Sequence, residues 1–489
     1  MTMKTILHTL VTGVLLIGLT TAAVAQKPDR SGPPKPGPTP SFTMPKFERF
    51  TLSNGLAVIL MEKHQVPLVQ INLVVRTGSA MDPAGKTGLA SMTTSMMMEG
   101  AGNKDALQLA DAIDYLGAQI ASYAGMHTSS VSMEVPVTKL DAALALQTDI
   151  ALRPTFAPAE LERKRKNRLT NLLQWRDEPR SLASVTFNRT LYPNGHPYGA
   201  SAIGDEAAIR SLRVEDLRQF HTQYFQPANA FLVVVGDVTV AQMKTKLEEA
   251  FGVWKGTAAA APALPPIMQV EKRSVVFVDK PGAPQTEIRI GRIGAPRVTD
   301  DYYALVVMNT ILGGSFSSRL NQNLREEHGY TYGAGSSFGF RMLPGPFLAA
   351  SAVQAAITDS ALIEFMKELQ AIQAPVPEAE LDRAKNYVAL GFPGEFQTVG
   401  DIAGKIEEMV IYGLPADYFS HYVSRILAVT AADVQRVAKK YVDPAKMAIV
   451  LVGDRAGLEG KVNALKLGPM TNMSIEDVLG KAPVIEGAK

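Results

Sequence analysis

The sequence predicts an α+β fold in two homologous domains, each a mostly antiparallel sheet packed with helices. The main observation is an internal repeat, in which residues 214–237 match residues 431–454 at a constant offset of 217, without a gap. Each copy has an amphipathic stretch that stops before a proline and an apolar run that ends in Gly-Asp. This pattern predicts a helix, a turn and a buried strand, and its repetition indicates a duplicated domain.

The first half shows hairpin and helix patterns in a regular order. Asn54 and Gly55 lie between two alternating apolar runs, which is a strong hairpin signal. The order that follows is a strand at 68–77, helices at 87–98 and 106–116, strands at 118–124 and 128–135, and helices at 138–152 and 158–175. The second half repeats this order from a strand near residue 273, through a helix over 301–312, to strands after residue 332. Hairpins with clustered helices are typical of an α+β domain.

The N-terminus has the three parts of a secretory signal. Lys4 precedes an apolar run at residues 10–19, and small residues follow up to Ala25, after which we expect cleavage. An uncleaved anchor is the alternative, but a run of this length is too short for a hydrocarbon core of ~30 Å. We therefore expect a periplasmic protein with no membrane attachment after cleavage of the signal peptide.

Composition shifts divide the rest of the chain. After the signal peptide, residues 1–25, the Pro-rich segment 26–46 is typical of an extended tether. A second Ala- and Pro-rich break begins at residue 256 and reads as an interdomain linker. We predict a first domain over 47–255, the linker over 256–272, a second domain over 273–468 and a tail over 469–489.

Two compositional facts narrow the function. The chain contains no cysteine, which excludes disulfides, Cys-rich zinc sites and thiol nucleophiles. Its net charge is +2, and the loss of Lys4 with the signal peptide leaves +1, so nothing points to nucleic acid.

Several segments carry a family pattern in their order and spacing. They are the Asn54-Gly55 hairpin, the Gly-Ser to Gly-Leu-Ala stretch at 78–90, LYPNGHPYG at 191–199, the two repeats and GGSFSSRLNQNLREEHGYTYG at 313–333. Together they resemble the insulinase (pitrilysin, inverted-zinc) family of peptidases over nearly all of residues 47–467. The motifs are specific in combination, although none would suffice alone.

In that family the helix after Gly-Leu-Ala begins His-x-x-Glu-His, which supplies two zinc ligands and the Glu that activates water, and a later Glu is the third protein ligand. Here Ser91 and Ser95 stand at the histidine positions and Thr94 at the position of the base. Asn171, eight residues before Pro179, stands at the third ligand position. The resemblance therefore implies a degenerate metal site, no cofactor in this chain and no catalysis by this chain alone.

The histidines support the loss of a metal site. The chain has seven, and the two closest in sequence, His196 and His221, are 25 residues apart, so no helical His pair exists. We expect the hydroxyls of Ser91, Thr94 and Ser95 to bond preceding carbonyls or water rather than to act as nucleophiles.

The second half keeps two residues that the resemblance places beside the substrate. Arg325 and Tyr332 match an Arg and a Tyr that reach the peptide near the scissile bond in active members. A guanidinium and a phenol suit hydrogen bonding to a peptide carbonyl or a developing oxyanion. The alternative is that Arg325 pairs with Glu326 or Glu327 at a solvated helix end while Tyr332 packs in a sheet.

These features predict the substrate-binding, non-catalytic subunit of a zinc metallopeptidase complex that degrades unfolded peptides. A homologous partner subunit would bear the zinc, and the two chains would form a heterodimer. Two alternatives remain at this stage: a structural or peptide-holding module without proteolysis, and an independent metallopeptidase with an unusual site.

Overall fold

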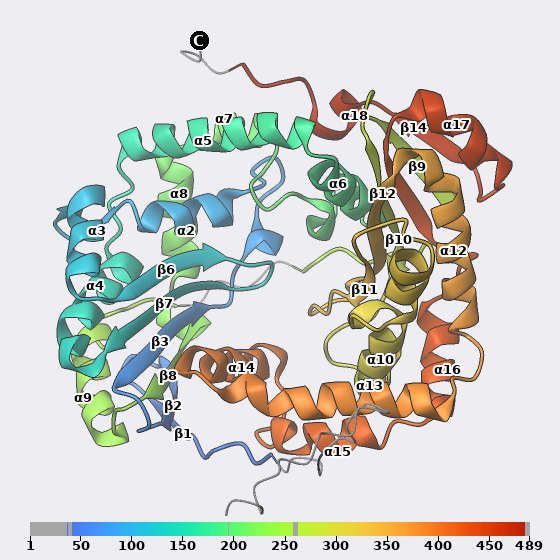
Figure 1. Ribbon diagram of the computed structural model, residues 1–489. Coiled ribbons are helices and arrows are strands. Elements are labelled where there is room, and N and C mark those ends of the chain that lie inside the picture. The colour runs from blue at the N-terminus through green and yellow to red at the C-terminus, as the bar shows by residue number, and fades with distance from the viewer. Residues whose placement is uncertain (1–36, 38–41, 194, 258–262, 485–489) are drawn as a thin grey trace, which may run out of the picture. The chain divides into compact units, whose positions relative to one another are not determined.

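The structure is a computed structural model that describes residue 37 and residues 42–193, 195–257 and 263–484. It contains two six-stranded sheets with helices around them, which confirms the predicted α+β class (Figure 1). The predicted signal peptide, residues 1–25, lies outside the described residues, as does most of the predicted tether at 26–46. Within the described part of the chain, no helix combines the length and apolar character needed to cross a membrane.

The first sheet has the order β1-β2-β8-β3-β7-β6 and is antiparallel except between β2 and β8. Its strands are β1 Glu48–Thr51, β2 Ala57–Glu62, β3 Leu68–Val75, β6 Gln119–Ala124, β7 Ser129–Pro136 and β8 Ala230–Gly236. A two-stranded hairpin, β4 Gly100–Ala101 with β5 Lys104–Asp105, is separate from it. Strand β6 therefore forms one edge of the first sheet.

The second sheet has the order β11-β12-β10-β13-β9-β14, with parallel pairing of β9 to both β13 and β14. Its strands are β9 Ser274–Asp279, β10 Gln285–Ile293, β11 Ala334–Phe338, β12 Pro346–Gln354, β13 Ala448–Gly453 and β14 Met470–Met473. Part of the segment that we predict as a tail thus joins this sheet as β14.

The helices fall into two similar sets. The first half has α2 Leu89–Met97, α3 Ala106–Tyr115, α4 Leu140–Leu152, α5 Pro158–Asp177, α6 Pro179–Leu191, α7 Glu206–Ser211, α8 Val214–Tyr224 and α9 Val240–Phe251. The second has α10 Tyr302–Asn309, α11 Arg319–Asn321, α12 Thr358–Ala371, α13 Glu378–Gly391, α14 Val399–Tyr412, α15 Tyr422–Leu427, α16 Ala431–Tyr441, α17 Arg455–Ala464 and α18 Ile475–Leu479.

The two halves are structural copies. Helices α8 and α16 begin and end 217 residues apart, as the sequence repeat predicts. Five strands of each sheet pair in the same order, β2-β8-β3-β7-β6 in the first and β9-β13-β10-β12-β11 in the second. Only the remaining edge strand differs, because β1 is antiparallel to β2 whereas β14 is parallel to β9.

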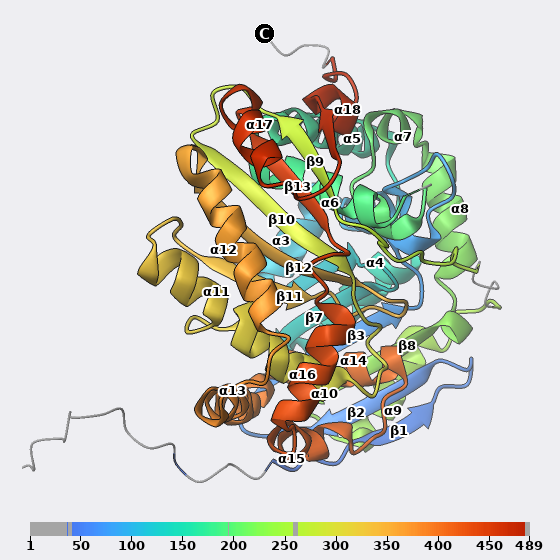
Figure 2. The same cartoon turned by 90° about the vertical axis from the view of Figure 1, so that its right-hand side faces the viewer.

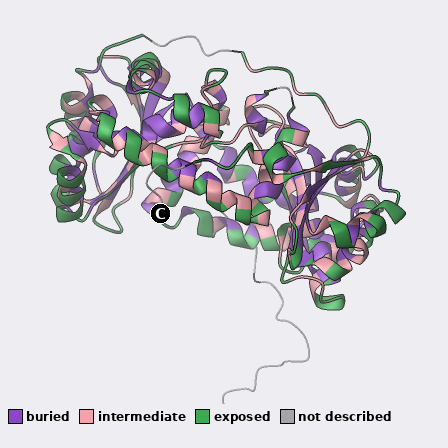
Figure 3. Cartoon of the chain, turned by 90° about the horizontal axis from the view of Figure 1, so that it is seen from above, coloured by how far each residue is buried: buried purple, intermediate pink, exposed green. Residues whose placement is uncertain are grey.

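Both faces of each sheet are buried, and the alternation of side chains shows what covers them. On β13, Ala448, Val450 and Val452 belong to a cluster with apolar residues of α6, whereas Ile449 and Leu451 belong to a cluster with α12 and α16. Figure 2 shows α12 and α16 lying over this sheet, and Figure 3 shows that buried residues concentrate in the strands.

The first sheet has the reciprocal arrangement. On β8, Phe231, Val233 and Val235 share a cluster with Ile402 and Ile406 of α14. The alternate residues of β8 face the helices of the first half in a separate cluster. Helix α14 contacts β3 and β8, and α6 contacts β10 and β13, so each half supplies one helix to the other half's sheet (Figure 1).

Two local features differ from the sequence prediction. The helix expected over 87–98 begins at Leu89, because Gly88 has a left-handed φ of 85°. Helix α6 was not predicted at all. It starts afresh at Pro179 after extended backbone at Glu178, since a proline at the first helical position disfavours helical backbone at the residue before it.

Replacing Phe187 by Ala should weaken the packing of α6 on the second sheet. The side chain is 2% exposed and packs against the second sheet, so Phe187→Ala should lower the free energy of unfolding by about 3 to 5 kcal/mol. Leu107 on α3 is 78% exposed, and Leu107→Ala should change it by less than about 0.5 kcal/mol. Urea unfolding followed by circular dichroism would measure both, and equal effects would contradict the packing role of α6.

Candidate functional site

The first turn of α2 is held by a carboxylate from the loop before it. Asp82 accepts hydrogen bonds from the backbone N–H of Gly88 at 2.7 Å and of Ala90 at 2.8 Å. A Cβ at residue 88 would lie 2.6 Å from the backbone of Ile203, so glycine is required there for close approach as well as for its positive φ. These contacts fix the start of α2, where the degenerate metal positions lie.

Two of the hydroxyls at the degenerate positions, those of Ser91 and Thr94, bond mainly to backbone. Ser91 Oγ donates to the carbonyl of Ala202 and accepts from Arg168 Nη2 at 3.0 Å. Thr94 Oγ1 is buried and lies 3.2 Å from the carbonyl of Ala90, one turn earlier on the helix. Such back-bonding leaves neither hydroxyl arranged as a nucleophile with an adjacent base.

A groove of about 410 Å³ opens beside these residues. Ser91, Thr94 and Ser95 line one side, Lys164 of α5 contributes a cation, and residues 120–124 of the edge strand β6 line the other side together with Met98. The structure thus brings three of the four degenerate positions together next to a sheet edge.

Asn171, the fourth position, is exposed on α5 and does not line this groove. Lys164, Arg168 and Asn171 follow one another at helical spacing along α5, and Arg168 contacts α2 through Ser91. Arg168 and Lys164 were missed by sequence reasoning. The sequence signal that could have identified them is their helical spacing from Asn171.

Burial and charge shape the electrostatics of this region. Burial raises the pKa of Asp82 to about 6, despite its backbone hydrogen bonds and the nearby Arg168. Burial also lowers the pKa of Arg168 to about 10, so its guanidinium remains protonated at neutral pH. Burial acts to raise the pKa of Glu99, but Lys164 and Arg163 together hold it below its ordinary value.

The donor set does not fit zinc. Zinc sites use histidine, carboxylate or thiolate ligands, whereas these positions present three hydroxyls and an amide next to a buried cation. Across the described residues, no group of three or more His, Asp or Glu side chains is arranged to hold a metal ion.

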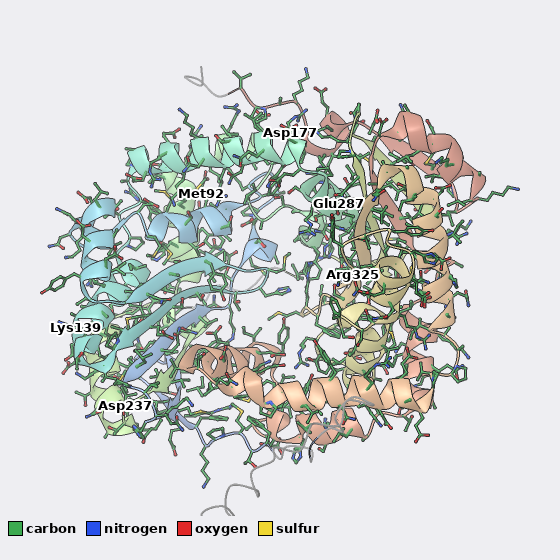
Figure 4. All side chains as sticks on the ribbon, viewed as in Figure 1. Met92, Lys139, Asp177, Asp237, Glu287 and Arg325 are labelled. Atoms are coloured by element: carbon green, nitrogen blue, oxygen red, sulfur yellow. The ribbon has the colours of Figure 1, made fainter. Side chains whose placement is uncertain are left out.

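The two residues expected to meet substrate lie in the second half, where Figure 4 labels Arg325. Arg325 belongs to the π-helix η7, Gln322–Glu327, with its guanidinium carbon 4.5 Å from the centre of the exposed Phe316 ring. Its Nε is also 3.5 Å from Glu326 Oε1, so the pairing considered from the sequence is present. Within the described residues, no hydrogen bond or ion pair joins Arg325 to the degenerate positions on α2.

Tyr332 does not pack in a sheet. Its side chain is 93% exposed, and β11 begins only at Ala334. The loop that carries it is nevertheless anchored, because Thr331 Oγ1 lies 2.7 Å from the carbonyl of Ala352 and 2.9 Å from Ser351 Oγ. The backbone is therefore held while the phenol stays in solvent.

The fold is a duplicated α+β domain with a degenerate metal position. Comparisons with known proteins show which family has this fold. Residues 57–202 match the protein family described as "Insulinase (Peptidase family M16)". Residues 211–388 match the family described as "Peptidase M16 inactive domain". A solved structure titled as a peptidase M16 inactive domain from Pseudomonas fluorescens is similar, with a TM-score of 0.78 and 26% identity, over 83% of this chain and 98% of that one.

Two relatives carry contrasting descriptions. An uncharacterized zinc protease, YmxG of Bacillus subtilis, is 26% identical over 286 residues, which are 58% of this chain and 68% of the relative. A non-peptidase homolog, YmxG of Helicobacter pylori, is 23% identical over 410 residues, which are 81% of this chain and 92% of the relative. The chain belongs to the insulinase family, peptidase family M16. The match of residues 211–388 to the inactive domain, together with the donor set at the degenerate positions, supports a non-catalytic member of that family.

The raised pKa of Asp82 predicts a pH effect on stability. A carboxyl whose pKa is about 6 in the folded state binds more protons than in the unfolded state between about pH 4 and 6, so its contribution falls as pH rises. The free energy of unfolding of the wild type minus that of Asp82→Asn should therefore decrease by roughly 2 kcal/mol over this range. Urea unfolding at several pH values would test this, and a flat difference would contradict it.

Proposed function

We propose that this chain is the substrate-binding, non-catalytic subunit of a periplasmic zinc metallopeptidase complex. A homologous insulinase-family partner bears the zinc and performs hydrolysis. This chain binds an unfolded peptide and supplies Arg325 and Tyr332 to the partner's active site. It needs no cofactor of its own, and its signal peptide directs it to the periplasm.

The observation that carries this proposal is the presentation of Tyr332. A large aromatic side chain that is 93% exposed leaves most of its apolar surface in water. Here the preceding residue, Thr331, is anchored to β12 through Ser351 and Ala352, so the exposure belongs to a held loop. This arrangement suits a side chain that meets a second molecule.

The chemistry of the pair suits a peptide near its scissile bond. Arg325 is always charged and has several donors, and its contact with Phe316 limits the directions that the guanidinium can take. Tyr332 can donate from its hydroxyl to a carbonyl whose oxygen gains charge during hydrolysis. Both groups thus stabilise charge that develops during hydrolysis by the partner.

The groove beside β6 offers a place for the rest of the peptide. An edge strand has backbone groups that an added extended peptide can pair with, and Tyr123 on β6 is exposed. This observation also favours the second candidate, a peptide-holding module without proteolysis. The two candidates differ in whether a zinc-bearing partner gains activity from this chain.

Truncating either residue should reduce the activity of the complex. With a zinc-bearing family member from the same organism as partner, Arg325→Ala and Tyr332→Phe should each lower kcat/KM for an unstructured peptide by about 100-fold. The reason is the loss of one donor to the developing oxyanion, with the fold and the partner's zinc unchanged. Steady-state kinetics on the co-purified pair would measure the loss.

Exposed residues on α13 provide matched controls. Arg383→Ala and Tyr387→Phe should leave kcat/KM at the wild-type value, since both positions are exposed and lie on another element. Equal activity of the partner with and without this chain would reject complementation. Peptide binding by the chain together with that result would instead support the holding module.

A further inference from the structure

A buried cation lies beside Ser91, the first of the degenerate metal positions. The side chain of Arg168 is 9% exposed, and it reaches from α5 toward α2 and the loop before α7. Its Nη1 donates to the carbonyls of Gly88 at 2.9 Å and Ile203 at 3.0 Å, and its Nη2 donates to Ser91 Oγ at 3.0 Å. A buried charge requires such partners, because an unpaired one is strongly unfavourable.

The segments that Arg168 joins include those that a metal would join. Ser91 stands at the first ligand position on α2, and α5 carries Asn171 at the third. A metal bound there would link α2 to α5 through its coordination bonds. Here the guanidinium fork of Arg168 makes that link and adds the loop at residue 203.

The carboxylate whose charge interacts with that of Arg168 already accepts hydrogen bonds from backbone. Asp82 is the carboxylate that interacts electrostatically with Arg168, and both its oxygens accept from the backbone of α2. The other nearby cation, Lys164, is paired with Glu99, which also pairs with Arg163. The region therefore has no spare carboxylate among these residues to offset a further two positive charges.

We infer that Arg168 takes the structural and electrostatic place of the metal ion in this chain. It is a positioning residue that ties α2, α5 and the loop at residue 203 together with a fixed cation. Its charge repels a divalent cation at short range. The site is consequently closed to zinc by Arg168 as well as by the loss of ligands, and restoring the ligands alone does not restore binding.

Metal binding by variants of the whole chain tests this inference. The first variant restores the family ligands and base through Ser91→His, Thr94→Glu, Ser95→His and Asn171→Glu. The second adds Arg168→Leu to these four changes. Zinc affinity is measured by competition with a chromogenic chelator and by metal content after dialysis, without reference to peptidase activity.

The four-residue variant should bind zinc no better than the wild type, and the variant with Arg168→Leu should bind one zinc at least 100-fold more tightly. Arg165→Leu, added to the four changes instead, is the matched control. Arg165 lies on the same helix and also donates to backbone carbonyls, those of Ile209 and Leu212, so its loss should give no gain in zinc affinity.

Each remaining outcome decides the question. Tight zinc binding by the four-residue variant with Arg168 intact would overturn the inference, as would an equal gain from Arg165→Leu. If the Arg168→Leu variant unfolds without zinc but folds with it, the metal has taken over the role of the arginine and the inference is supported. If that variant neither folds nor binds when zinc is added, the inference is wrong.

Discussion

Each sheet of this molecule depends on a helix from the other half to cover one of its faces. The alternate residues of β8 and β13 are apolar on both sides, so neither strand could face water without a large unfavourable exposure. Helices α6 and α14 satisfy this requirement reciprocally, α6 on the second sheet and α14 on the first. The duplicated halves are thereby joined through their cores, and the interdomain contact is made of the same apolar packing as a single domain.

The packing of α6 on the second sheet is linked through the chain to the degenerate site. Helix α5 carries Arg168 and Asn171 and ends at Asp177, and α6 begins two residues later at Pro179. The helix that closes the site against α2 is therefore continuous in sequence with the helix that packs on the other half. Arg168 holds α5 against α2, and the packing of Phe187 holds α6 on the second sheet.

Much of the fold could be predicted from sequence because its signals are local. The 217-residue offset, the Asn54-Gly55 turn and the alternating strands need no knowledge of tertiary contacts, and the helices and strands they predict are present. Helix α6 escaped prediction because its apolar face is completed by strands far away in the chain. Arg168 escaped because it belongs to a highly charged helical stretch, which is typical of a solvated face, and only the approach of α2 buries it. The roles of Arg325 and Tyr332 stay predictions, since they concern a second molecule.

The proposed function requires that this insulinase-family member has no metal centre of its own. The most direct measurement is native mass spectrometry of the purified wild-type chain with added Zn²⁺, followed by a chelator-sensitive peptide-cleavage assay on the same sample. The account predicts no stoichiometric zinc adduct and no chelator-sensitive cleavage by the chain alone. A one-to-one zinc adduct accompanied by cleavage that a chelator abolishes would contradict it.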